Sequence, residues 1–323
     1  MDKDIIVRPD PLKEVIFLFP ANSLGDMGYN DYILKSVLDA QKNTDFDFHY
    51  INPQTNSTAE LKPVFDYWLN YVRENADALL LLGSCDDYEN FVAAECTADE
   101  PAVNRILIFE SERDLPVRTV SFSGYGVSFL IGAVAYEKTQ AATSAYVSAF
   151  PDWNFLNSGR DGFVDGYTYA AAQSGVTAHV STMSLATSFD GFNMVDSTYR
   201  VASALYAESP FIYALAGTSN LGIYRYLRET NNPNLYTVGV DTDQSLFAKG
   251  IIGSMLKRMD LWLPACIQEW LQTGQLPASA QFDLNSGYID LLLAASYSSA
   301  LQPVVEQYRG IAQQKELEYL NSK

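Results

Sequence analysis

Two carboxylates follow a short apolar segment near residue 240, and they are the side chains whose position most clearly indicates chemistry. Leu235, Val238 and Val240 suit a buried strand of a parallel sheet. Asp241 and Asp243 come next, at the carboxyl end of that strand, where open α/β sheets bind their ligands. A carboxylate there can accept hydrogen bonds from both hydroxyls of a vicinal diol such as a ribose. The alternative is a polar turn in which Asp243 caps the next helix.

Composition narrows the classes of function. The chain has 323 residues, enough for two domains of ordinary size, and 48% of them are hydrophobic. Acidic residues number 39 against 21 basic ones, and the net charge of −18 argues against binding to nucleic acid or to anionic lipid. No apolar run reaches the roughly 18 residues of a membrane-spanning helix.

Cysteine and histidine are too scarce and too scattered for metal or nucleophilic chemistry. The three cysteines, Cys85, Cys96 and Cys266, lack the spacing of a metal or redox site. The only histidines are His49 and His179, far apart in the sequence. We therefore expect no metal, no cofactor and no enzymatic activity. The enzyme alternative is a nucleoside hydrolase in which the two aspartates after the strand hold a metal ion.

Strands alternate with helices along the whole chain, which predicts an α/β fold with parallel sheets and right-handed crossovers. The expected strands are 14–20, 46–52, 78–83, 105–109, 117–122, 145–150, 176–184, 211–216, 235–240, 251–255 and 288–293. The expected helices are 31–43, 59–74, 88–96, 128–142, 158–174, 197–207, 221–230, 259–273 and 298–318. No Pro-rich or Ser-rich linker separates the two βα series, so we expect two lobes joined by several short crossings, with a cleft between them.

Six short motifs, in order along the chain, carry a resemblance to a known family. They are Gly25-Asp26-Met27-Gly28-Tyr29-Asn30, Ser128-Phe129-Leu130-Ile131-Gly132, Gly162-Phe163-Val164-Asp165-Gly166, Ala216-Gly217-Thr218, Val238 to Gln244, and Gly253 to Asp260. In these motifs and their order the chain resembles the basic membrane protein family of substrate-binding lipoproteins, whose best-known members are purine nucleoside receptors.

The resemblance implies a type I periplasmic-binding-protein fold, with two Rossmann-like lobes, a multi-crossing hinge and a ligand trapped on closure. We expect residues 13–118 with 253–287 in the N-terminal lobe, and 119–252 with 288–323 in the C-terminal lobe. Residues 1–12 would be a stub that follows an export and lipidation segment. The resemblance further implies an extracytoplasmic, lipid-anchored protein that delivers its ligand to an ABC permease, and we expect it to be a monomer.

Roles for the loop after the first strand follow from its residue types. The ring of Tyr29 can lie flat on a heterocyclic base, or it can be a core aromatic at the start of a helix. Asp26 and Asn30 offer polar groups to the edges of a ligand, and capping of the helix is the rival role for Asp26.

The remaining candidates follow later strands. Asp241 is assigned to the ribose hydroxyls, and Lys257 to the same sugar or to Asp241. Gly217 and Ser84 lie on loops where the backbone can approach the ligand. Trp153 is the best candidate for a second aromatic wall, ahead of packing between lobes. Phe189 and Phe192 are weaker candidates for that wall.

One departure from the family concerns specificity. Family members carry an acidic or polar residue just before the motif that begins at Ser128, whereas this chain has Tyr125 in a segment without a carboxylate. A tyrosine hydroxyl cannot accept two hydrogen bonds from a guanine edge as a carboxylate can. We expect a nucleoside-like ligand, in the first place a purine nucleoside, with other nucleosides, riboflavin and other ring-plus-polyol compounds left open. A sensor or regulatory domain of the same fold is the alternative to a transport protein.

Overall fold

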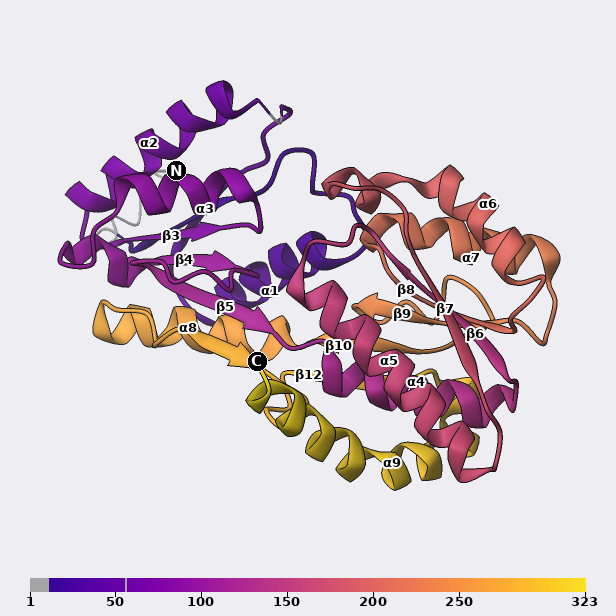
Figure 1. Ribbon diagram of the computed structural model, residues 1–323. Helices are drawn as coiled ribbons and strands as arrows, with labels where there is room; N and C mark the ends of the chain where they lie inside the picture. The colour runs from indigo at the N-terminus through magenta and orange to yellow at the C-terminus, as the bar shows by residue number, and fades with distance from the viewer. Residues whose placement is uncertain (1–11, 56) are drawn as a thin grey trace, which may run out of the picture. The chain divides into compact units, whose positions relative to one another are not determined.

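The computed structural model describes residues 12–55 and 57–323, and in this part of the chain the strands form two six-stranded sheets (Figure 1). The first sheet has the order β11-β5-β4-β3-β1-β2, and the second has the order β12-β10-β9-β8-β6-β7. Five strands of each sheet therefore repeat the 2-1-3-4-5 order of doubly wound folds, in which the strand order reverses beside the first strand. The predicted α/β fold with parallel sheets is confirmed.

The bounds of the elements are as follows. The strands are β1 (Glu14–Leu18), β2 (Asp47–Ile51), β3 (Ala78–Leu82), β4 (Ile106–Phe109), β5 (Arg118–Phe122), β6 (Thr143–Ser148), β7 (His179–Ser184), β8 (Phe211–Leu215), β9 (Tyr236–Asp241), β10 (Ile251–Lys257), β11 (Ala280–Phe282) and β12 (Ile289–Leu293). The α-helices are α1 (Tyr29–Asn43), α2 (Thr58–Glu74), α3 (Asp86–Glu95), α4 (Tyr125–Thr139), α5 (Asn154–Gln173), α6 (Val195–Leu205), α7 (Asn220–Thr230), α8 (Met259–Thr273) and α9 (Ala295–Asn321). Short 3₁₀ segments are η1 (Pro101–Arg105), η2 (Phe189–Asn193) and η3 (Gly217–Ser219).

The described chain divides into two compact units. Unit 1 holds the residues up to Leu24, Ile33–Ser121 and Asp260–Ala280, and unit 2 holds Gly25–Tyr32, Phe122–Met259 and Gln281–Lys323. The assignment of residues 253–287 to the N-terminal lobe is wrong for β10, because β10 pairs with β9 and β12 in the second sheet. The predicted stub at residues 1–12 lies, apart from residue 12, outside the described residues.

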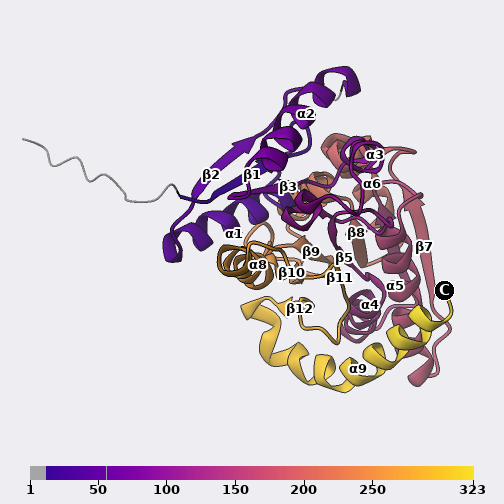
Figure 2. The same cartoon turned by 90° about the vertical axis from the view of Figure 1, so that its left-hand side faces the viewer.

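The core of unit 1 forms around its central strands, which are apolar on both faces. All five residues of β3 are buried, as a central parallel strand between two helical layers requires. Side chains of β1, β3 and β4 pack against α2 and α3 on one face. Figure 2 shows α1 and α8 on the other side of β1 from α2.

Helices cover both faces of the sheet in unit 2. Ala145 and Val147 of β6 pack with α6 and α7, whereas Tyr146, between them in the sequence, meets Phe163 of α5. This alternation places α4 and α5 on the face opposite α6 and α7. Because helices cover both faces of this sheet, the ends of its strands are the part that can carry polar groups.

Over the described residues, no helix is both long and apolar enough to span a bilayer.

Candidate functional site

Four neighbouring parallel strands of unit 2 end at the same edge of the second sheet. These strands, β10, β9, β8 and β6, are consecutive in the sheet order and mutually parallel. Lys257 ends β10, Asp241 ends β9, Gly217 follows β8, and Trp153 follows β6. We call these four residues the strand-end cluster. The structure therefore brings four of the predicted site residues to the edge where doubly wound sheets bind ligands.

Asp241 has a strained backbone. Its φ is +69°, in the left-handed region that non-glycine residues seldom adopt. The amide of Thr242 donates to the carbonyl of Val240 across it, at 2.8 Å, which makes Asp241 the centre of a γ-turn of the rare positive-φ form. Such strain costs on the order of 1–3 kcal/mol and is concentrated at functional sites. The turn holds the backbone of Asp241 in this conformation.

Lys257 is enclosed by aromatic rings and paired with Asp241. Its Nζ lies 3.5 Å from Oδ1 of Asp241, and only 4% of the Lys257 side chain is exposed against 13% for Asp241. The same Nζ lies 3.9 Å from the ring centre of Phe155, 4.9 Å from that of Tyr29 and 5.3 Å from that of Phe122. Cation–π contacts contribute about 0.5–1 kcal/mol when exposed and about 2 when desolvated, so the rings offset part of the cost of burying the charge.

Gln244 fastens the end of β9 and was not selected from the sequence. Its Oε1 accepts hydrogen bonds from the amide of Val240 at 3.0 Å and from the hydroxyl of Tyr224 at 2.6 Å. Its Nε2 donates to the carbonyl of Met27 at 3.3 Å. Gly239 permits this packing, since a Cβ there would lie 2.7 Å from Cβ of Gln244. Gln244 thus joins the Asp241 turn to the loop before α1; the signal for it was its place in the motif Val238 to Gln244.

The loop before α1 is held by its own carboxylates. Asp26 accepts hydrogen bonds from the amides of Gly28, Asn30 and Asp31 and from Nδ2 of Asn30, at 2.9–3.2 Å. Asp26 therefore caps α1, the rival role that the sequence left open, and Asn30 directs its side-chain amide to Asp26. The same loop delivers the ring of Tyr29 to the ammonium group of Lys257.

Further aromatic rings lie next to Phe155 at the same edge of the sheet. We call Phe150, Trp153, Phe155, Phe189 and Phe192 the aromatic group. The ring of Trp153 lies 6.2 Å from that of Phe155 and is stacked on Phe150, and its edge meets Phe192 at 5.9 Å. Phe189 packs on Phe150 and is 38% exposed. The structure therefore groups Trp153, Phe189 and Phe192, the three aromatic candidates of the sequence analysis, into one cluster.

Gly217 closes the aromatic group from the side of β8. Its φ is +53°, and a Cβ at this position would lie 2.9 Å from the Phe192 ring. A side chain is thus excluded by conformation and by contact. The backbone of the loop that follows β8 therefore lies directly against the ring of Phe192.

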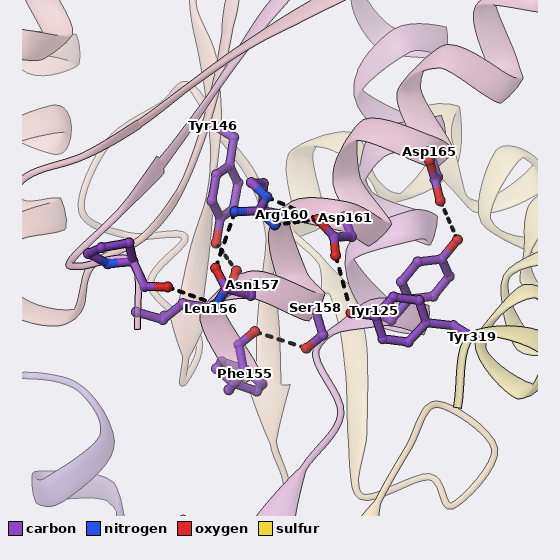
Figure 3. Close-up of polar contacts among 11 residues, drawn as sticks. Tyr125, Tyr146, Phe155, Leu156, Asn157, Ser158, Arg160, Asp161, Asp165 and Tyr319 are labelled. Atoms are coloured by element: carbon purple, nitrogen blue, oxygen red, sulfur yellow. Dashed lines mark hydrogen bonds and ion pairs between the residues drawn. The ribbon is translucent and has the colours of Figure 1, made fainter. Parts of the chain in front are cut away.

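Two predicted residues lie elsewhere. Ser84 follows β3 and belongs to unit 1. Tyr125 lies in a groove of about 500 Å³ between α4, α5 and α9, which none of the strand-end cluster lines. Its hydroxyl donates to Asp165 at 2.5 Å, and its ring stacks on Tyr319 at 4.2 Å (Figure 3). Burial and the carboxylate of Asp165 both raise the pKa of Tyr125.

Asp243 supports the turn rather than a metal site. It is exposed, and its Oδ1 accepts from the amide of Ser245 at 3.0 Å. In the part of the chain that the structure describes, no three His, Cys, Asp or Glu side chains are placed to hold a metal ion. This edge of the sheet therefore carries a half-buried acceptor, Asp241, and a buried donor, Lys257, beside several aromatic rings. Chemically, the pair can exchange hydrogen bonds with hydroxyl groups, and the rings can stack on a flat ring.

Comparison with known proteins identifies similar sequences. The family model described as ABC transporter substrate-binding protein PnrA-like matches residues 13–319. Basic membrane protein D of Borreliella burgdorferi (strain JD1) is 30% identical over 160 residues, which are 49% of this chain and 44% of that protein. The chain thus matches less than half the length of this curated relative.

Solved structures show the same fold at low sequence identity. A solute-binding protein of an ABC transporter system from Aeropyrum pernix K1 has a TM-score of 0.71 at 17% identity, over 94% of this chain and 86% of that one. A periplasmic solute-binding protein from Actinobacillus succinogenes 130z, with bound D-allose, has a TM-score of 0.65 at 10% identity, over 90% and 100%. The expected type I fold of two α/β lobes is confirmed.

Proposed function

Because the chain belongs to the PnrA-like family of ABC transporter substrate-binding proteins, we propose that it captures a nucleoside-like ligand and delivers it to an ABC permease. The ligand would bind at the carboxyl edge of the second sheet, with its sugar on Asp241 and Lys257. Its ring would lie on Tyr29 and on the aromatic group that includes Trp153. Proteins of this class act outside the cytoplasm, and we propose the same location, with lipid anchoring and a monomeric state as further parts of the proposal.

The observation that carries the proposal is the pairing of a strained aspartate with a buried lysine. A protein keeps a left-handed aspartate only where the surrounding structure holds it, and here Gln244 and the γ-turn do so. Lys257 lies beside that carboxylate with only 4% of its side chain exposed. Both groups can exchange part of their mutual contact for hydrogen bonds to a vicinal diol, one as acceptor and the other as donor.

The energies are adequate for capture. Stacking on an aromatic ring contributes about 1–3 kcal/mol per base, and a hydrogen bond to a charged group about 1.5–3 kcal/mol. Two such hydrogen bonds and stacking on both faces of the ring can together reach about −8 kcal/mol, the free energy that micromolar binding requires. Closure of the two units on the ligand, as in other hinged binding proteins, would then retain the ligand for transfer.

Specificity for the base of the ligand involves the segment before Ser128, where this chain departs from its family. Family members carry an acidic or polar residue before the motif at Ser128, and this chain has no carboxylate there. It has Tyr125 instead, whose hydroxyl donates a hydrogen bond to Asp165. We propose that base discrimination is weaker than sugar recognition. A free sugar is the second candidate ligand, because the structurally similar protein from Actinobacillus succinogenes carries D-allose.

A thermal-shift screen tests the proposal. A ligand that binds only the folded protein raises its melting temperature, and saturation at a hundred times Kd adds about 2.7 kcal/mol of stability. We expect purine nucleosides to raise the melting temperature and the corresponding free bases to have little effect. A shift with D-allose or ribose alone would favour the sugar. No shift with nucleosides, riboflavin or sugars would contradict the proposal.

A further inference from the structure

Glu316, on the C-terminal helix α9, is a completely buried carboxylate that the proposed binding site does not use. Its exposure is 0%. Its Oε1 accepts from the hydroxyl of Ser123 at 2.5 Å and from the amide of Gly126 at 3.0 Å, and its Oε2 accepts from the amide of Leu284 at 2.8 Å. Burial raises the pKa of Glu316, and the three donors oppose that rise. A buried carboxylate with three donors from distant segments is a built feature of the fold.

The three donors come from segments where the chain enters unit 2. The described chain passes between the units at the boundaries Leu24/Gly25, Tyr32/Ile33, Ser121/Phe122, Met259/Asp260 and Ala280/Gln281. Ser123 and Gly126 follow the third of these boundaries, and Leu284 follows the last. The two entering segments also contact each other, since the amide of Ser123 donates to the carbonyl of Phe282 at 2.7 Å. Glu316 therefore ties two entering segments to one helix.

A direct series of contacts leads from this carboxylate to the proposed ligand site. Ser123 is bonded to Glu316 and follows Phe122, whose ring lies 5.3 Å from the ammonium group of Lys257. Lys257 in turn pairs with Asp241. A shift of the segment at Ser123 would therefore move a wall of the cage around Lys257.

We propose that Glu316 is a positioning residue that fixes the hinge segments and thereby sets ligand affinity. The inference rests on the proposed function, because it concerns how that same site closes. Where only a fraction of molecules can close, the apparent Kd rises in inverse proportion to that fraction. Glu316 would keep this fraction high by holding both entering segments in one arrangement.

The residue at position 126 is adapted to the buried carboxylate of Glu316. A Cβ at Gly126 would lie 2.2 Å from Oε2 of Glu316, so α4 can approach the carboxylate only with a glycine there. Glu316→Gln preserves the size of the side chain but places an amide N–H₂ against either the amide of Leu284 or that of Gly126. One backbone donor then faces another donor, and one of the two segments is released.

Tyr308→Phe is the matched control. Tyr308 is buried on the same helix, and its hydroxyl donates to Glu137 on α4 at 2.8 Å, away from the entering segments. Both variants lose a hydrogen bond made by a buried residue of α9, so both are expected to melt at a lower temperature. Only Glu316→Gln is expected to loosen the hinge segments. Ser123→Ala, which removes one donor alone, is the milder variant for the same measurements should Glu316→Gln not fold.

Three measurements test the inference: hydrogen exchange of the peptides covering 122–128 and 281–286, small-angle scattering of the ligand-free protein, and the Kd of the nucleoside found in the thermal-shift screen. We expect Glu316→Gln to exchange faster in at least one of these peptides, to change the scattering profile and to raise Kd about threefold or more, as when the closing fraction falls to about a third. Tyr308→Phe should leave all three as in the wild type.

Suppose that Glu316→Gln has the scattering profile and the Kd of the wild type and differs only in a lower melting temperature. That result would overturn the inference and leave Glu316 a structural residue. Should the wild type bind no nucleoside, the proposed function fails, while exchange and scattering still decide the role of Glu316. Unchanged exchange and scattering would then overturn that role as well.

Discussion

Substitutions at Asp241 separate its backbone conformation from its role toward the ligand. Glycine adopts a φ of +69° without strain and asparagine tolerates it, whereas alanine does not. We expect Asp241→Ala to be less stable than Asp241→Gly by about 1 kcal/mol, since a Cβ at positive φ is disfavoured. Asp241→Asn keeps the shape of the side chain and removes the charge that faces Lys257 at 3.5 Å.

The effect on binding follows from the loss of the charged acceptor. A hydrogen bond to a charged group is worth roughly 1.5–3 kcal/mol, which corresponds to roughly a 10- to 150-fold rise in Kd for Asp241→Asn. Isothermal titration calorimetry with the nucleoside from the thermal-shift screen measures this rise, and thermal melts of the three variants measure the backbone effect. A Kd for Asp241→Asn within about twofold of the wild type would refute the assignment of Asp241 to the ligand. Equal melting temperatures for the alanine and glycine variants would refute the strain argument.

The remaining predictions concern a glycine, a buried amide and a surface ion pair. Gly217→Ala should cost about 1–3 kcal/mol of stability and weaken ligand binding, because its Cβ would meet the Phe192 ring at 2.9 Å; an unchanged melt would contradict this. Gln244→Ala should cost about 1–3 kcal/mol in urea unfolding, since a buried backbone N–H loses its acceptor. Arg73 lowers the pKa of Glu100, so the contribution of Glu100 is present above the ordinary pKa of 4.5 and is lost as pH falls through the lowered value. Glu100→Gln should therefore be less stable than the wild type by up to about 1 kcal/mol at pH 7 and equally stable in acid, and a difference independent of pH would contradict the pairing.

The order of strands and helices was predictable because buried parallel strands are apolar runs that end at turn residues. The five buried residues of β3 show the pattern most simply. The three-residue strand β11 was missed, since so short a segment has no readable period. Which sheet a strand joins is not written in its own residues, and β10 was assigned to the wrong lobe for that reason.

The site was predictable to the extent that it follows strand ends. Asp241 and Lys257 were predicted because each follows an apolar strand, and the structure brings them to within 3.5 Å. The rings of Phe122 and Phe155 around Lys257 were not foreseen, because they come from other elements and no local spacing links them. Asp26 shows the opposite case. It lies in a motif that suggested ligand binding, but its carboxylate accepts hydrogen bonds from the backbone of the helix that it caps.

The most direct test of the central claim is a crystal structure of the protein with the nucleoside that gives the largest thermal shift. We predict that the sugar hydroxyls lie within hydrogen-bond distance of Asp241 and Lys257, and that the base lies on the rings beside Gly217. A ligand seated in the groove at Tyr125, or one whose sugar avoids Asp241, would contradict the account.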